Sequence, residues 1–221
     1  LIHADAFFYD PQEKATFVQM DLCSAGNLRT WSSAKARTPT ENHSVMRQAA
    51  LGLVFLHERN IIHGDIKPEA LLMYSDTELR IGDFELHHSL PKGDTDPDAD
   101  PEDDLPAEEP EQVEEPDADD FYQDQYKGGD AEGSAGYQAP ELLGSSLQST
   151  MTTAVDVWAF GAVIFELFYK KRPQQDATGN VLVPVETLNR NVSDMLGGML
   201  AADPSERPSA SCVCMSPYFT T

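Results

Sequence analysis

The chain has few cysteines, and this scarcity limits the metal and disulfide chemistry open to it. Its three cysteines, Cys23, Cys212 and Cys214, are too few and too unevenly spaced for a disulfide framework or a complete zinc site. Such sparse cysteine usage suits a reducing compartment. We therefore expect an intracellular protein of the cytoplasm or the nucleus.

Long apolar runs are also missing. No run reaches the roughly 18 residues that a membrane-spanning helix needs, and the first ten residues do not resemble a signal peptide. We therefore expect no membrane partner. The chain starts at Leu1 and not at a methionine, so we expect a fragment of a longer protein. Its 221 residues are enough for one domain with a core of its own.

Basic residues are scarce, with 15 Lys and Arg against 38 Asp and Glu. No basic stripe is present, which argues against nucleic-acid binding. The formal net charge of −23 is concentrated: 18 acidic residues and Lys127 lie between Asp94 and Glu132, which accounts for −17 and leaves −6 elsewhere. This region is also rich in proline and poor in apolar residues, so we expect a disordered acidic insertion at 93–132.

Hydrophobic periodicity predicts the regular elements on either side of this insertion. We expect two strands, at 1–8 and 15–20, and a small hairpin at 71–74 and 79–81. A helix capped by Thr38 or Thr40 should run to His57. The nearly continuous apolar stretch at 155–167 predicts a buried helix, and 192–200 predicts an amphipathic one.

Five short motifs occur in one order along the chain. They are His-Gly-Asp-Ile-Lys-Pro-Glu-Ala at 63–70, Asp-Phe-Glu at 83–85, Ala-Pro-Glu at 139–141, Asp-Val-Trp-Ala-Phe-Gly at 156–161 and Asp-Pro-Ser-Glu-Arg-Pro at 203–208. In this order and spacing they resemble the protein kinase family, and Lys67 is typical of its serine/threonine-directed branch.

The resemblance implies an α+β protein kinase-like fold. It divides the chain into the last two strands of the N-lobe (1–20), a hinge (21–28) and a mostly α-helical C-lobe (29–221). The acidic insertion then belongs to the activation segment, and the protein uses ATP and Mg²⁺.

The resemblance also assigns roles to individual residues. Asp65 would accept the proton of the substrate hydroxyl, and Lys67 would offset charge on the transferred phosphoryl group. Asp83 would hold Mg²⁺ against the nucleotide phosphates. Ser134 takes the place of a hydroxyl that bonds the catalytic Asp and Lys.

Other matched positions imply binding or structural roles. Met20 fits the back of the adenine pocket, and Asp21 to Cys23 fit the hinge whose backbone pairs with adenine. The remaining positions imply architecture: His63 packing on Phe84, a buried ion pair between Glu141 and Arg207, and Asp156 holding the backbone of the catalytic loop.

Several positions depart from the family pattern. Ala70 replaces an Asn that ligates a second magnesium ion, and its methyl group offers no ligand atom. Glu85 replaces the Gly of the metal-binding triplet, where glycine allows unusual backbone angles. Gly64 replaces an Arg that pairs with activation-loop phosphate. The Gly-rich loop and strand lysine of the family do not occur in this chain.

Three functional hypotheses remain open. The leading one is a fragment of a serine/threonine kinase whose full-length parent transfers phosphoryl groups from ATP to protein hydroxyls. The alternative is a pseudokinase, a scaffold or binding module with a degraded metal site. In the third, the acidic insertion recruits basic protein partners. The sequence does not indicate an oligomeric state.

Overall fold

The computed structural model describes residues 1–12, 14–84, 87–90, 136–143, 151–174, 181, 183 and 190–220. Glu85, Ser134 and the acidic insertion at 93–132 lie outside the described residues, so what was expected of them stays a prediction. Within the described ranges the chain forms helices and three two-stranded antiparallel sheets. The α+β class predicted from the sequence is confirmed.

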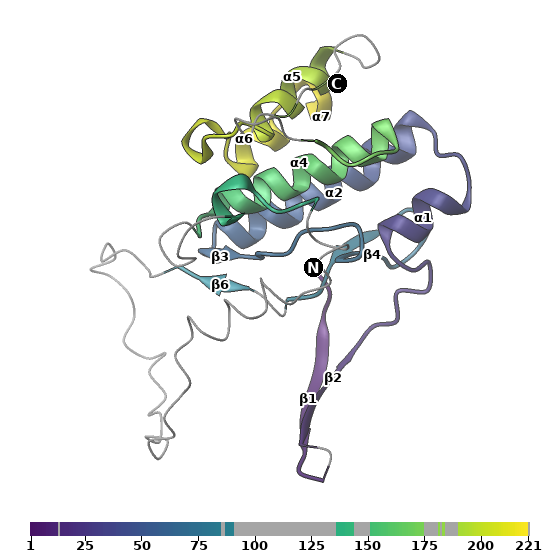
Figure 1. Cartoon of the computed structure of the whole chain (residues 1–221). Helices are drawn as coiled ribbons and strands as arrows, with labels where there is room; N and C mark the ends of the chain where they lie inside the picture. Colours follow the sequence, from purple (N-terminus) through teal and green to yellow (C-terminus); the bar gives the residue numbers. More distant parts are fainter. Residues whose placement is uncertain are drawn as a thin grey trace.

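Two N-terminal strands form a hairpin that projects away from the helices (Figure 1). β1 (Ala4–Asp10) pairs antiparallel with β2 (Ala15–Met20). Phe8 lies opposite Phe17, and their rings stack with centroids 5.1 Å apart. Aromatic and β-branched residues favour such strands. The hairpin stays largely exposed, and 70% of Phe7 is accessible to solvent.

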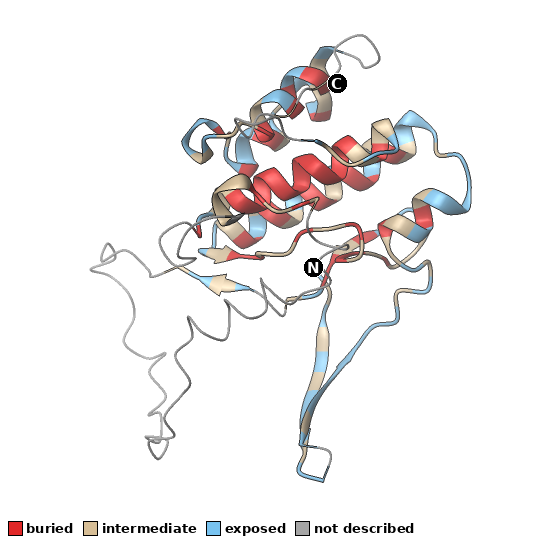
Figure 2. Cartoon of the chain, viewed as in Figure 1, coloured by how far each residue is buried: buried red, intermediate tan, exposed pale blue. Residues whose placement is uncertain are grey.

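Two long helices lie side by side in the larger part of the molecule (Figure 1). α2 (Pro39–His57) begins with a reciprocal cap, because Thr38 Oγ1 accepts the Glu41 N–H while the Glu41 carboxylate accepts the Thr38 N–H. α4 (Thr153–Tyr169) is capped by Thr152 and is buried along most of its length (Figure 2). A helix that is apolar on all sides belongs in the interior, and α4 forms the centre of the fold.

Short elements surround the loop at 63–70. α1 (Leu28–Ala34) is capped by Asn27. β3 (Ile61–Ile62) pairs with β6 (His88–Ser89), and β4 (Leu71–Met73) pairs with β5 (Leu79–Ile81). The loop therefore runs from one small sheet to the next, and its flanking residues Ile62 and Leu71 are fully buried.

The C-terminal elements pack around the two long helices. α5 (Arg190–Met199) contacts α4, α6 (Ala210–Cys214) contacts α2, and α7 (Pro217–Thr220) contacts α5. Two 3₁₀ turns, η2 (Pro140–Leu143) and η5 (Pro204–Glu206), complete this region. Gly161 lets α4 approach α5 closely, since an added Cβ would lie 3.0 Å from the Cβ of Met199. None of the helices in these ranges has the length and apolar character to cross a membrane.

Candidate active site

The loop at 63–70 brings Asp65 and Lys67 together. Lys67 Nζ donates a hydrogen bond to Asp65 Oδ2, and the two side chains are 20% and 18% exposed. The loop is held in place because the Leu28 N–H of α1 donates to the carbonyl of Pro68 at 3.1 Å. Both charged groups therefore sit on a fixed backbone and stay open to solvent.

Asp83 joins this pair from the segment that follows β5. Its Oδ2 lies 3.7 Å from Lys67 Nζ, and its side chain is 36% exposed. Burial would lower the pKa of Lys67, but the hydrogen bond to Asp65 and the charges of Asp65, Asp83 and Glu69 outweigh it and raise that pKa. Lys67 therefore keeps its positive charge at neutral pH.

The backbone of Asp83 is strained. Its φ of 63° lies in the left-handed region, which few non-glycine residues adopt. Buried neighbours fix this conformation. The His63 ring is fully buried, with Nε2 2.8 Å from the carbonyl oxygen of Gly82 and a centroid 4.9 Å from that of Phe84.

Asp156, at the start of α4, holds the backbone of the catalytic loop. Its buried carboxylate accepts hydrogen bonds from the backbone N–H groups of His63 and Gly64, both at 2.9 Å. His57 Nε2, at the end of α2, lies 2.9 Å from the same carboxylate. One side chain thus links α4, α2 and the loop that carries Asp65.

Glu141 and Arg207 form an ion pair that joins η2 to the segment after η5. Arg207 donates to both Glu141 carboxylate oxygens, at 2.6 and 2.7 Å. The Arg207 side chain is completely buried and that of Glu141 is 11% exposed. This bidentate geometry is the strongest form of arginine–carboxylate contact.

The structure describes the surroundings of two departures from the family pattern, Gly64 and Ala70. Gly64 has a φ of 81°, a left-handed conformation that glycine adopts without steric cost. Ala70 is fully buried, and its carbonyl accepts the Gly82 N–H at 2.9 Å, so position 70 lies beside the segment that carries Asp83. Glu69, next to Ala70, is hydrogen-bonded to Arg29.

The predicted hinge contacts the β4–β5 hairpin through Asp21 and forms a turn after Cys23. Asp21 forms an ion pair with Arg80 at 2.7 Å, and the carbonyl of Cys23 accepts the Gly26 N–H at 3.0 Å. Asp21 lines an open hollow of about 730 Å³ with residues of α2 and β5. Met20 is 45% exposed at the end of β2. That these residues bind adenine stays a prediction.

A cluster around Arg29 was missed in the sequence. Arg29, on α1, bonds Glu69 of the catalytic loop, Glu166 of α4 and the hydroxyl of Tyr137. The partners lie 40, 137 and 108 residues away along the chain, so no local pattern connects them. One signal was available: Glu166 is the second acidic residue of an otherwise apolar helix.

The residues present can serve a magnesium–nucleotide complex only in part. Within the described ranges no three His, Cys, Asp or Glu side chains converge as a ready metal cage. Mg²⁺ needs no such cage, because it commonly binds one or two carboxylates together with substrate phosphates and water. The exposed carboxylate of Asp83 fits this role. Ala70 supplies no second ligand.

The chain is similar to known protein kinases along most of its length. A catalytic chain of phosphorylase b kinase (gamma, liver/testis isoform) from Bos taurus is 25% identical over 220 residues, covering 92% of this chain and 46% of the relative. Serine/threonine-protein kinase GRIK1 of Arabidopsis thaliana is 28% identical over 185 residues, which cover 79% of this chain and 38% of the relative. A calcium and calcium/calmodulin-dependent serine/threonine-protein kinase of Pisum sativum is 27% identical over 229 residues, which cover 95% of this chain and 37% of the relative.

The chain spans less than half the length of these relatives. The sequence profile described as "protein kinase domain" matches residues 1–219, so the match is not confined to the part after the predicted hinge. Together with the meeting of Asp65, Lys67 and Asp83, this match shows that the chain belongs to the protein kinase family.

Proposed function

We propose that the protein transfers the terminal phosphoryl group of ATP to serine or threonine hydroxyl groups of other proteins. The observation that carries this proposal is the convergence of Asp65, Lys67 and Asp83 at one partly exposed site. Phosphoryl transfer requires mainly positioning and charge stabilisation. A carboxylate base, a cation and a metal-binding carboxylate supply those functions.

Each group has one role in this mechanism. Asp65 would orient the substrate hydroxyl and accept its proton, while Lys67 would offset negative charge on the transferred group. Mg²⁺, when bound with ATP, would neutralise the phosphates, and Asp83 would hold it. The backbone between Asp21 and Cys23 would bind adenine. Similarity to serine/threonine kinases supports the choice of acceptor.

The test is transfer from γ-labelled ATP by the intact protein. Peptides that contain Ser, Thr or Tyr as the only acceptor are offered with Mg²⁺, and the labelled amino acid is identified. The proposal predicts label on Ser or Thr that disappears when Mg²⁺ is chelated. Nucleotide binding without any transfer would instead support the pseudokinase alternative.

One observation favours that alternative. Ala70 is buried beside the Asp83 segment without a ligand atom, and Glu69, the nearest acidic substitute, is engaged by Arg29. The site would then hold magnesium through fewer protein groups than the family pattern provides.

We propose that the substrate or partner is a protein. The acidic segment at 93–132 would favour a basic one.

Restoring the ligand should strengthen nucleotide binding. Ala70→Asn is expected to raise the affinity for magnesium–ATP several-fold, because the amide oxygen would emerge beside Asp83. Isothermal titration with ATP at fixed Mg²⁺ measures the change. Ala70→Leu is the control of similar size, since it creates the same crowding at this buried position without a ligand atom. Equal affinities of the two variants would contradict the expectation.

A further inference from the structure

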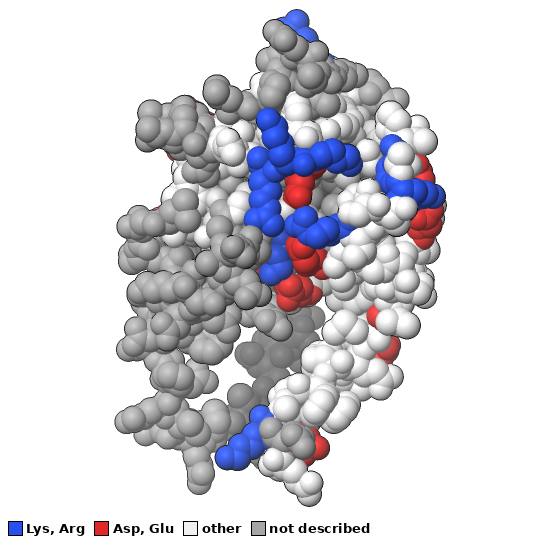
Figure 3. Space-filling model, turned by 45° about the vertical axis from the view of Figure 1, so that its right-hand side comes forward, with Lys and Arg blue, Asp and Glu red and all other residues white. Residues whose placement is uncertain are grey.

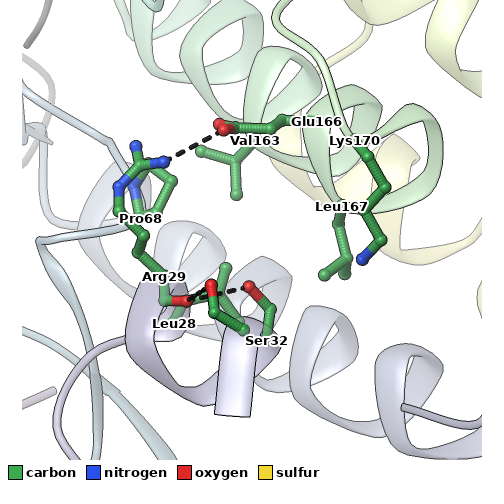
Figure 4. A pocket seen from close by; sticks show the side chains of 9 residues that line it. Leu28, Arg29, Ser32, Pro68, Val163, Glu166, Leu167 and Lys170 are labelled. Atoms are coloured by element: carbon green, nitrogen blue, oxygen red, sulfur yellow. Dashed lines mark hydrogen bonds and ion pairs between the residues drawn. The ribbon is translucent and has the colours of Figure 1, made fainter. Parts of the chain in front are cut away.

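A pocket opens where the end of α1 and the start of α2 meet the end of α4. Its volume is about 390 Å³, within the range of about 300–1,000 Å³ that is typical of small-molecule sites. Ser32, Ser33, Leu167 and Lys170 line this pocket and also border the neighbouring hollow of about 250 Å³ that Figure 4 shows. We call the larger of the two the Lys170 pocket.

The polar part of the wall offers hydrogen-bond donors. No carboxylate is among the described residues that line the Lys170 pocket, whereas the cationic side chains of Lys35, Arg37 and Lys170 do line it. Asn42 borders the pocket as well and is only 8% exposed. No described residue forms a hydrogen bond with its side-chain amide, so the amide N–H groups are available to a ligand. An anion, which accepts several hydrogen bonds, matches this wall.

Lys170 is the wall cation whose charge no described counter-ion offsets. Lys35 and Arg37 both contact Asp76, at 3.0 and 2.7 Å, and Glu41, at 3.6 and 3.5 Å. Two carboxylates thus balance these two positive charges. No described residue forms a hydrogen bond or an ion pair with Lys170 Nζ. The pocket therefore keeps a positive charge, in a chain whose formal net charge is −23.

The carboxylate of Glu166 does not neutralise this charge. Figure 4 shows Glu166 extended towards Arg29, which bonds it at 3.0 Å, whereas the Lys170 side chain extends past Leu167. Figure 3 brings the α1 side of the molecule forward and shows Lys and Arg side chains gathered around a few acidic ones. These basic side chains would attract an approaching anion.

The rest of the wall is apolar. Ala36, Pro39 at the start of α2, and Leu167 and Phe168 at the end of α4 line the pocket. Leu167 is 5% exposed, and Phe168 packs against the hydrophobic core, so both have fixed surroundings. In small-molecule sites such apolar walls hold the body of the ligand, while a few polar groups fix its orientation. A ligand for this pocket therefore needs both an anionic head and an apolar body.

We propose that the Lys170 pocket binds a small amphiphilic anion, an apolar molecule with a carboxylate or phosphate head. The Lys170 ammonium group and the Asn42 amide donate hydrogen bonds to the head. The body lies against Pro39, Leu167 and Phe168. The pocket is lined by none of the three groups proposed for phosphoryl transfer, so its binding can be measured whether or not the protein transfers phosphate.

The experiment measures binding to the intact protein by isothermal titration. Octanoate and octyl phosphate supply the two anionic heads on one apolar body, octanol supplies the same body without charge, and octylammonium reverses the charge. At least one anion should bind with a Kd of about 1 mM or tighter. Octanol and octylammonium should bind about tenfold more weakly or not at all, because they lack the charge-assisted hydrogen bonds. The anion that binds more tightly distinguishes a carboxylate ligand from a phosphate ester.

Matched variants isolate the cause. Lys170→Gln should weaken anion binding about tenfold. Lys171→Gln removes the same charge from the next residue, which is exposed and does not line the pocket, and it should leave binding unchanged. Ala36 is exposed, so the fold should tolerate its replacement. Ala36→Glu should abolish anion binding by adding a carboxylate to the wall, whereas Ala36→Gln, of nearly the same size, should retain it.

Failure of both anions to reach a Kd of about 1 mM would overturn the inference. Octanol binding as tightly as the anions would overturn it as well, since the pocket would then be an apolar site without selectivity for charge. Equal losses for Lys170→Gln and Lys171→Gln would also contradict it, because the attraction would come from the general charge of this face.

Discussion

Replacing Arg207 by alanine is expected to lower the free energy of unfolding by about 3–5 kcal/mol, the cost of breaking a buried ion pair. The buried guanidinium bonds both carboxylate oxygens of Glu141. It also donates to the carbonyl oxygens of Ala201, Ala154 and Ala202 at 2.9, 3.1 and 3.2 Å. Its loss leaves Glu141 as an unpaired charge with little access to water.

Urea unfolding of both single variants measures this effect. Glu141→Ala should cost a comparable amount, because it strands the buried Arg207. Arg190→Ala serves as control, and its exposed pair with Asp194 should change stability by less than about 1 kcal/mol. A loss for Arg207→Ala no larger than that of the control would mean that the pair does not contribute as the geometry implies.

Much of the fold could be predicted because its signals are local. The Thr38 cap and Glu41 three residues later mark the start of α2 in the sequence, and the apolar run at 155–167 marks α4 as a buried helix. The β1–β2 and β4–β5 hairpins follow from short apolar runs around turn residues. In each case the signal lies within a single helix or a single hairpin.

The candidate site could likewise be predicted only in part from the sequence. Asp65, Lys67 and Asp83 could be predicted because they lie in motifs that resemble those of the protein kinase family. The structure brings them together. The cluster around Arg29 could not be predicted, since its partners come from three distant segments and depend on how α1 packs against the catalytic loop. The sequence showed only that Gly64 replaces an arginine of the family pattern. The structure adds that its φ of 81° is a backbone conformation that favours glycine.

The second large effect is expected at Asp65. Asp65→Asn should reduce phosphoryl transfer about a thousandfold, as loss of a general base commonly does. The amide is nearly the same size as the carboxylate, and the side chain is partly exposed, so the fold should tolerate it. Asn can still accept the Lys67 hydrogen bond but cannot take the proton of a substrate hydroxyl.

Magnesium-dependent transfer from γ-labelled ATP, compared between the intact protein and its Asp65→Asn variant, tests the central claim most directly. Both proteins should bind magnesium–ATP with similar affinity and melt at similar temperatures, while only the unsubstituted protein labels Ser or Thr peptides. Label incorporation that survives Asp65→Asn undiminished would contradict the assignment of Asp65 as the base and, with it, the proposed mechanism.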